Sequence, residues 1–413
     1  MRGAAVCCGR GFRQTPLSYH NLHERGAREW ITSARVGLEE RGPVLLFTGA
    51  AMQDPVEEEM RRKDEKPPVT VRIARQLALE HFGVRGPHWI DRIVRFGRLA
   101  TRVVPLNSYD DKNFLFYGRN IVKFYNGVES SHPDFIDAQA RAMERARGAG
   151  IVTNTPKLTK EGKDVAYIEL EGGEGLPARR HAMRVLDFIP GKTLGDVEQS
   201  DTLVEEAGSL VGSLDACFRD FDHPGFHRTH LWDLRNSLKL RGFVEHVVGE
   251  KRRELAERVL RDFEEKVLQE EGNLRWSVVH NDANDQNILV DGGRVIGIVD
   301  WGDALRTWAV CNPAIAIAYL MLDKEKEDML ARAAAFLRGY RAGSGCELEE
   351  SEIRVIRTLI AVRLACSAIM AAYSSSKEPE NEYLTLTLDA GWEALEKFLA
   401  IAEQEFLKAC DLI

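Results

Sequence analysis

One segment, residues 278–303, constrains the fold of this chain more than any other. It reads VVHNDANDQNILVDGGRVIGIVDWGD, in which a polar loop precedes two short apolar runs separated by a turn at residues 291–293. Apolar runs of this length on either side of a glycine-containing turn predict a β-hairpin. The hairpin would bring Asp300, after its second strand, back beside Asn287, before its first strand.

The polar residues of this segment have the side chains and the order that phosphoryl transfer requires. Asp282 would orient and deprotonate an acceptor hydroxyl, and His280 would hold the loop. Asn287, five positions after Asp282, and Asp300 would supply oxygen ligands for Mg²⁺. Protein kinases have the same order and spacing in their catalytic loop and metal-binding triplet, which here read HND and DWG. The segment therefore predicts a catalytic loop and a metal site in one cleft.

Composition argues against several other classes of protein. Of 413 residues, 44% are hydrophobic and 29% charged, which is typical of a soluble globular protein. The net charge of −8 does not favour a nucleic-acid partner. The longest apolar stretch, residues 310–322, is interrupted by Asn312 and Pro313 and is too short to span a bilayer. We therefore expect small-molecule ligands and neither nucleic acid nor membrane as a partner, while the oligomeric state is left open.

The first 65 residues differ from the rest, and we expect a poorly ordered extension that the chemistry does not need. Residues 57–66 form a run of charges that predicts a solvated linker or helix end. The seven cysteines are odd in number and contain no Cys-x-x-Cys pair, which favours free thiols in a reducing compartment. We expect a cytoplasmic protein; a mitochondrial transit peptide is the alternative, because residues 1–23 carry three arginines and no acid.

Residues 66–191 have the pattern of a small strand-rich lobe. A helix is predicted from Val69 to Phe82 and strands from Val103 onward, with a foreign interruption at residues 85–98 between them. The strand at residues 120–124 carries a single lysine within an apolar run. With the catalytic loop downstream, Lys123 is predicted to pair with the α and β phosphates of a nucleotide.

Three further parts of this lobe are assigned to the nucleotide. The polar loop with Ser108 and Tyr109 would cover the phosphates, and the strand that ends at Asp187 and Phe188 would lead into a hinge whose backbone recognises the purine. A helix is predicted over residues 133–147. An acid that orients Lys123 is expected on this helix. The expected position is closest to Gln139, with Asp137 and Glu144 nearby, so the acid is left unassigned.

Residues 192–413 are predicted to be mainly helical, apart from the hairpin. Amphipathic patterns indicate helices near residues 203–219, 237–246, 252–268, 314–322, 326–342, 349–373 and 380–408. Before this region, in the strand-rich lobe, a short strand is expected at residues 156–158. A small antiparallel strand-rich lobe followed by a larger helical lobe predicts an α+β fold of the protein-kinase-like two-lobe type.

The motifs resemble those of the aminoglycoside phosphotransferase and choline kinase family. The resemblance covers residues 100–413 and includes SYDDKNF at 108–114, HNDANDQNIL at 280–289 and MAAYS at 370–374. Within the family, the segments are most similar to members that phosphorylate 5-hydroxy-L-lysine. The resemblance implies transfer of the γ-phosphoryl group of GTP, with Mg²⁺, to the side-chain hydroxyl of that amino acid. Asn281 stands where related enzymes commonly have Gly.

An acceptor with two amino groups and a carboxylate needs acids and a cation around it. The candidate acids are Asp285, Asp303 and Glu380, and the candidate cations are Arg306 and Arg363. Three alternatives stay open: ATP as the donor; choline, ethanolamine, homoserine or an aminoglycoside as the acceptor; and a catalytically silent nucleotide-binding or scaffold protein.

Overall fold

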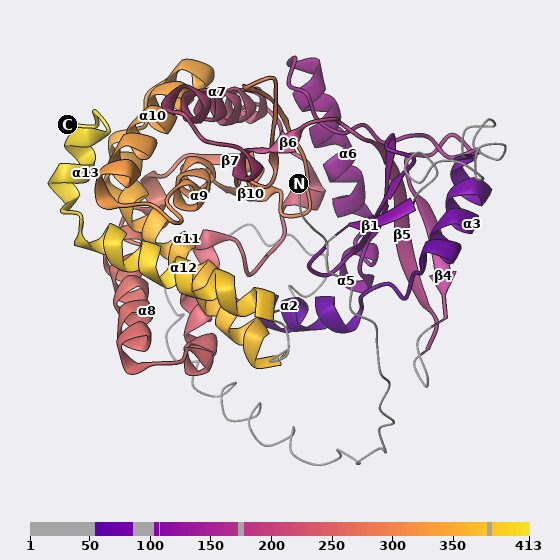
Figure 1. The fold of residues 1–413 in the computed structure, drawn as a ribbon, viewed down its shortest axis with the longest axis horizontal. Helices are drawn as coiled ribbons and strands as arrows, with labels where there is room; N and C mark the ends of the chain where they lie inside the picture. The colour runs from indigo at the N-terminus through magenta and orange to yellow at the C-terminus, as the bar shows by residue number, and fades with distance from the viewer. Residues whose placement is uncertain (1–53, 86–102, 107, 172–176, 378–381) are drawn as a thin grey trace, which may run out of the picture. The chain divides into compact units, whose positions relative to one another are not determined.

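The computed structural model describes residues 54–85, 103–106, 108–171, 177–377 and 382–413, which belong to one compact unit (Figure 1). The predictions for residues 1–53 and for almost all of the interruption at 85–98 fall outside these residues. The strands are β1 (Val103–Leu106), β2 (Lys112–Phe116), β3 (Asn120–Phe124), β4 (Ala166–Leu170), β5 (Arg179–Asp187), β6 (Lys192–Thr193), β7 (Trp276–Val279), β8 (Ile288–Asp291), β9 (Arg294–Ile298) and β10 (Leu305–Trp308). The helices are α2 (Pro55–Asp64), α3 (Val71–Phe82), α5 (Gly127–Ser130), α6 (Pro133–Gly148), α7 (Asp201–Phe218), α8 (Glu250–Asp262), α9 (Cys311–Leu320), α10 (Lys326–Ser344), α11 (Glu350–Lys377), α12 (Glu382–Ala400) and α13 (Glu403–Ala409).

The first half is a five-stranded antiparallel sheet in the order β1-β2-β3-β5-β4. Because side chains alternate between the faces of a strand, β3 sends Val122 and Phe124 into a core shared with Ala74 and Ala78 of α3. The same alternation points Lys123 to the opposite face, where it lines two cavities. The predicted helix that precedes the sheet is confirmed, with Thr70 as its N-cap and Gly83, at φ 66°, as its C-cap.

The second half is mainly helical, so the predicted fold class is confirmed. One large core joins its helices to the hairpin strands. Helices α7 and α10 approach closely through glycines: a Cβ on Gly339 would lie 1.8 Å from the carbonyl oxygen of Glu205, and one on Gly208 would lie 2.0 Å from that of Phe336. A larger residue at either position would force the two helix backbones apart.

Helix α11 is the central helix of this half. It is long and apolar enough to cross a membrane by length and composition alone, and 83% of its most apolar window is buried inside the protein. The sequence analysis predicted it at residues 349–373, and the structure extends it to Lys377. Its buried side chains include Arg363, which reaches the catalytic loop.

The predicted hairpin is confirmed as β8 and β9, with Ile288 paired to Ile298. The amide of Val299 then donates to the carbonyl of Asn287 at 2.9 Å. This bond places Asp300 next to Asn287, as the sequence predicts.

Three predicted elements differ from the structure. Residues 237–246 belong to a 3-10 helix, η3 (Leu234–His246), instead of an α-helix. The strand expected at residues 156–158 is a single bridge between Pro156 and Leu186. The last predicted helix is broken into α12 and α13, because the chain bends at Ile401 and Ala402 is extended.

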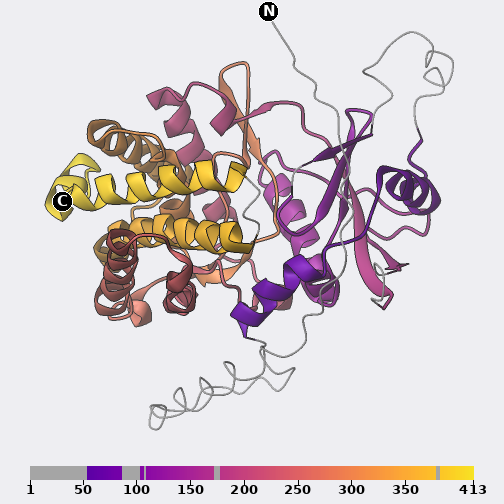
Figure 2. The ribbon, with the colours of Figure 1, turned by 60° about the horizontal axis from the view of Figure 1, so that its bottom comes forward.

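The expectation of a poorly ordered, solvated segment up to residue 65 is wrong for residues 54–65. They include α2, in which Glu59 and Arg62 are 4% and 3% exposed. These two side chains are three positions apart and therefore share one helix face. Figure 2 shows α2 at the junction of the sheet and the helical half. The charge run is thus a helix with a buried charged face.

Candidate active site

The catalytic loop holds Asp282 with three side-chain donors. Arg363 Nη2 and Asn284 Nδ2 each lie 2.9 Å from its Oδ1, and Asn287 Nδ2 lies 2.8 Å from its Oδ2. Asn284 and Asn287 belong to the loop itself and Arg363 belongs to α11, so donors on both oxygens fix the orientation of the carboxylate. Burial raises the pKa of Asp282 to about 7, the neighbouring Asp303 adds to the rise, and Arg363 opposes it.

His280 lies behind the loop. Its Nε2 is 3.1 Å from the carbonyl oxygen of Val299, and its ring packs against Trp301 with 5.0 Å between ring centroids. Burial lowers the pKa of His280 to about 4, so the imidazole is neutral at physiological pH. This bond ties the catalytic loop to the end of β9, next to Asp300.

Two site residues have left-handed backbone conformations. Asn281 has φ 62° and Asp300 has φ 65°. Glycine adopts this region without strain, and Asn and Asp are the residues that tolerate it best after glycine. The Asn at position 281 is therefore compatible with the backbone. Its side-chain amide also donates to the carbonyl of Trp232 at 3.3 Å.

Lys123 bridges the two halves of the chain. Its Nζ lies 2.9 Å from Asp111 Oδ2 and 3.3 Å from Asp300 Oδ1. The lysine is buried, and the two carboxylates raise its pKa well above the ordinary value in spite of that burial. It is therefore charged, as a group that contacts phosphates must be.

The acid beside Lys123 is Asp111, which precedes β2, and no residue of α6 takes this role. Gln139 Oε1 accepts from Tyr125 at 3.0 Å, whereas Asp137 and Glu144 form ion pairs with His223 and with Arg141, respectively. The sequence signal for Asp111 was the adjacent pair of acids in SYDDKNF. The antiparallel register that pairs Lys112 with Phe124 explains how this loop reaches Lys123.

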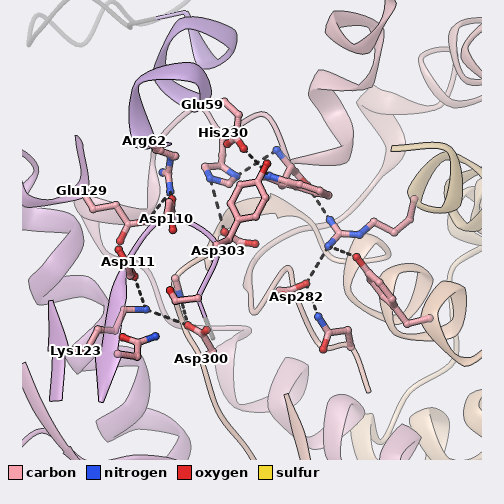
Figure 3. Close-up of a pocket in the computed structure, with 18 residues that line it drawn as sticks. Glu59, Arg62, Asp110, Asp111, Lys123, Glu129, His230, Asp282, Asp300 and Asp303 are labelled. Atoms are coloured by element: carbon pink, nitrogen blue, oxygen red, sulfur yellow. Dashed lines mark hydrogen bonds and ion pairs between the residues drawn. The ribbon is translucent and has the colours of Figure 1, made fainter. Parts of the chain in front are cut away.

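A polar cavity of about 340 Å³ lies above these residues (Figure 3). Its charged lining is Glu59, Arg62, Asp110, Asp111, Lys123, Glu129, Asp282, Asp300, Asp303 and Arg363. Seven carboxylates thus face three permanent cations. Burial raises the pKa of Glu59, of Asp110 and of Asp282 each to about 7, and it raises that of Asp303 as well. The ionised form of these carboxyl groups is therefore costly in the empty cavity, and a cationic ligand would favour it.

A second, apolar cavity of about 380 Å³ adjoins the polar one. Its apolar lining is Leu106, Ile121, Met143, Leu186, Phe188, Ile189, Leu289 and Val299. Asn113, Lys123 and Asp300 line both cavities. A molecule with a flat apolar end and an anionic end could therefore lie in the apolar cavity and reach Lys123 at the junction.

The other predicted nucleotide residues lie on both sides of this junction. Ser108 and Tyr109 line the polar cavity, and Tyr109 packs edge-on against Trp232 with 6.5 Å between ring centroids. Phe188 lines the apolar cavity. Asp187 lines neither; its carbonyl accepts from Asn154 at 2.8 Å, and its carboxylate accepts from the amide of Thr155.

Of the five predicted acceptor residues, the structure brings Asp303 and Arg363 into the polar cavity. Asp285 and Arg306 line neither cavity: the carboxylate of Asp285 lies against Gly195, and Arg306 is in β10, paired with Val278. They are therefore not placed to contact an acceptor. Glu380 lies outside the described residues.

The cavity residues that the sequence did not reveal include Glu59, Arg62 and His230, together with Glu129, Trp232 and Tyr319. Glu59 and Arg62 belong to a charge run that carried no periodic signal. His230 is buried, and its Nε2 lies 3.7 Å from Asp303 Oδ1. No spacing rule in the sequence links these residues to the catalytic loop.

The side chains of Asn287 and Asp300 suit a divalent metal whose other ligands are phosphate oxygens and water. The nitrogen of the Asn287 amide is bound to Asp282, which leaves its oxygen for a metal, and Asp300 is ionised because Lys123 lowers its pKa. Among the described residues, no group of three or more His, Cys, Asp or Glu could hold a metal alone. Mg²⁺ commonly binds one or two protein carboxylates together with phosphates and water, so this small donor set fits.

Comparisons with known proteins agree with this geometry. The profile of the phosphotransferase enzyme family matches residues 102–346. Hydroxylysine kinase of Mus musculus is 30% identical over 75% of this chain and 87% of its own length. Among solved structures, a microcompartment-associated aminopropanol kinase (TM-score 0.61, 16% identity, 83% of this chain and 99% of that one) has a similar fold. So does an amicoumacin kinase solved with AMP-PNP and Ca²⁺ (TM-score 0.59, 16% identity, 82% and 95%). The chain belongs to the phosphotransferase enzyme family, and it is a small-molecule kinase that acts on a hydroxyl group.

Proposed function

We propose that this kinase transfers the γ-phosphoryl group of GTP, bound with Mg²⁺, to the side-chain hydroxyl of 5-hydroxy-L-lysine, giving 5-phosphohydroxy-L-lysine. One observation carries the proposal: the acid-rich polar cavity at Asp282 meets the apolar cavity at Lys123 and Asp300. The similarity to proteins named hydroxylysine kinase supports the choice of acceptor.

The acceptor would bind in the polar cavity with its hydroxyl at Asp282. The hydroxyl oxygen attacks the γ-phosphorus, the bond from that phosphorus to the bridging oxygen breaks, and the hydroxyl proton passes to the Asp282 carboxylate. Because the transition state of phosphoryl transfer is loose, orientation contributes more than base strength. The three donors that fix Asp282 serve that orientation.

The nucleotide would place its phosphates at the junction of the cavities. Lys123 would bind them directly, while Asp111 keeps the ammonium group in place at 2.9 Å. Asn287 and Asp300 would hold Mg²⁺, which neutralises charge on the phosphates when it is bound. His280 would keep both metal ligands beside Asp282 through its bond to Val299.

Charge complementarity favours 5-hydroxylysine over acceptors with fewer amino groups. This amino acid carries two ammonium groups and one carboxylate, so it brings net positive charge into a cavity with an excess of carboxylates. Choline and ethanolamine have no carboxylate to contact Arg363, and homoserine has one ammonium group.

The purine would lie in the apolar cavity beside the segment after β5. There the amide of Phe188 is bonded to the carbonyl of Arg119 at 2.9 Å. Phe188 and Ile189 line this cavity, so backbone groups of this segment would be available to the edge of the base. Guanine and adenine both present a donor and an acceptor on one edge, so ATP is the donor to compare with GTP.

The test is an acceptor panel with each nucleotide. Purified protein is incubated with GTP or ATP, Mg²⁺ and each of 5-hydroxy-L-lysine, choline, ethanolamine, homoserine and an aminoglycoside, and the phosphorylated product is measured directly. The highest kcat/KM is expected for 5-hydroxy-L-lysine with GTP, and Asp282→Asn serves as the inactive control. A higher kcat/KM for another acceptor would replace the proposed substrate, and a higher value with ATP would replace the proposed donor.

A further inference from the structure

The polar cavity has a wall that lies outside the family match. Helix α2 precedes residue 102, where that match begins, yet Glu59 and Arg62 line the cavity. Figure 3 shows Glu59 at the end of the cavity away from Lys123, with Asp303 between Glu59 and the catalytic loop. Helix α2 therefore offers the acceptor a potential contact that residues 102–346, the part matched by the family, do not offer.

Glu59 is a buried carboxylate with little compensation from the protein. The residue is 4% exposed, and Trp232 Nε1 donates to its Oε1 at 3.3 Å. The neighbouring Arg62 has its closest bonds elsewhere, to Glu129 at 2.7 Å and to Asp110 at 3.2 Å. A buried carboxylate with one neutral donor is costly unless a positive charge lies beside it. Burial raises the pKa of Glu59 to about 7 although the charge of Arg62 opposes the rise, in agreement with that cost.

The surrounding wall is polar and incompletely bonded. His230 is 2% exposed and lines the same cavity, and its Nε2 has no hydrogen-bond partner among the described residues. Glu129 is 3% exposed, and its Oε2 is likewise without a hydrogen bond within the described part of the chain. Buried polar atoms are almost always bonded in native proteins, so these atoms indicate a place for a polar ligand.

The order of acids along the cavity matches the order of groups along the acceptor. In 5-hydroxy-L-lysine the ε-amino carbon is adjacent to the hydroxyl carbon, and the α-amino group lies at the other end of the chain. With the hydroxyl at Asp282, the ε-ammonium group would reach Asp303. Figure 3 shows Asp303 between Asp282 and Glu59, and the charge of Asp303 acts on both carboxyl groups.

We infer that Glu59 of α2 binds the α-ammonium group of the acceptor, so that α2 is a specificity-determining wall of the active site. This inference rests on the proposed function, since it assumes an acceptor with an α-amino group. Glu59 carries no step of the transfer itself, and its effect is on acceptor binding.

The first test compares Glu59→Gln with Glu57→Gln. Glu57 is exposed on the same helix, so its variant controls for changes to α2 in general. For Glu59→Gln, the KM for 5-hydroxy-L-lysine is expected to rise roughly 10- to 100-fold, the range typical for loss of a hydrogen bond to a charged group. The KM for GTP and the kcat should change by less than about 2-fold. Glu57→Gln should match the wild type.

The second test uses an acceptor that lacks the contacted group, 6-amino-5-hydroxyhexanoic acid. Wild-type enzyme should have a higher KM for it than for 5-hydroxy-L-lysine, and Glu59→Gln should add no further increase. An equal penalty on both acceptors would show that Glu59 acts only on the fold, and an unchanged KM for 5-hydroxy-L-lysine would also overturn the inference. Should Glu59→Gln fail to fold, Glu59→Asp keeps the charge on a shorter side chain, and it must raise the KM for 5-hydroxy-L-lysine alone.

The wild-type control separates this inference from the proposed function. If wild-type enzyme phosphorylates 5-hydroxy-L-lysine and Glu59→Gln is unaffected, the inference fails while the proposed function stands. If wild-type enzyme leaves 5-hydroxy-L-lysine unmodified and phosphorylates another acceptor, both fail.

Discussion

Asp282 and Arg363 form the ion pair on which the acceptor side of the site depends. Arg363 is 2% exposed, lies in the centre of α11 and reaches Asp282 at 2.9 Å. Its guanidinium also contacts the hydroxyl of Tyr319 at 3.1 Å. The arginine both fixes the position of the carboxylate and keeps it more acidic than burial alone would allow. The sequence analysis predicts Arg363 as a ligand for the acceptor carboxylate. The structure shows that Arg363 also forms an ion pair with Asp282.

The pH dependence of turnover follows from this pair. In the proposed mechanism Asp282 accepts a proton and must be ionised, so its pKa of about 7 predicts that kcat/KM falls as the pH drops below about 7. Arg363 lowers that pKa; Arg363→Met should therefore move the acidic limb to higher pH by about one unit or more. Steady-state rates measured from pH 5.5 to 9 would test this, and an acidic limb at the same pH in both enzymes would contradict it.

Helix α2 connects the sheet to the helical half and holds the loop that precedes β2. Arg62 binds Asp110 in that loop and Glu129 of α5, and the adjacent Asp111 binds Lys123. Lys66, just after α2, donates to the carbonyl of Ser108 at 3.0 Å. The helix thus supports the position of Lys123 from a segment that sequence analysis treated as dispensable.

Two deletions would locate the boundary of the functional chain. Removal of residues 1–53 should leave kcat/KM within about 2-fold, whereas removal of residues 1–65 should lower it by at least about 10-fold, because the Arg62 contacts and Glu59 are lost. Rates, together with circular dichroism to verify folding, would distinguish the two proteins. Equal activity in a folded protein without residues 1–65 would show that α2 has no part in the reaction.

At the scale of the whole molecule, the nucleotide would bind to both halves at once. The apolar cavity takes Ile121 and Leu186 from the sheet and Leu289 and Val299 from the hairpin region. A ligand that binds the folded protein and not the unfolded chain stabilises the fold by about 2.7 kcal/mol at one hundred times its Kd. Nucleotide with metal should therefore raise the unfolding temperature.

The variant Asp300→Ala would distinguish the contribution of the metal to this rise in unfolding temperature from that of the nucleotide. In wild-type protein a nonhydrolysable GTP analogue should raise Tm more with Mg²⁺ than without it. In Asp300→Ala the increment due to Mg²⁺ should disappear, since a proposed metal ligand is missing. Differential scanning fluorimetry would measure both values, and an unchanged Mg²⁺ increment would count against Asp300 as a metal ligand.

The fold class, the hairpin and the proximity of Asn287 and Asp300 could be predicted from the sequence alone. These features depend on local patterns: apolar periodicity, a glycine turn and fixed spacing within one loop. The same locality explains why Lys123 could be chosen, since a single lysine in an apolar strand is an unusual pattern. Residues such as Asp285 also lie in the loop, but spacing alone gave no sign that its carboxylate would pack on Gly195.

The residues that are distant in sequence and meet at the site could be identified only from the tertiary structure. Asp111 reaches Lys123 through strand register, Arg363 reaches Asp282 from a helix about eighty residues later, and Glu59 enters the cavity from a segment before the family match. Charged residues are common in any sequence, and only their burial distinguishes these three site residues from charged residues on the surface. Burial is a property of the packed chain, because it depends on which elements cover the side chain, and no local pattern encodes it.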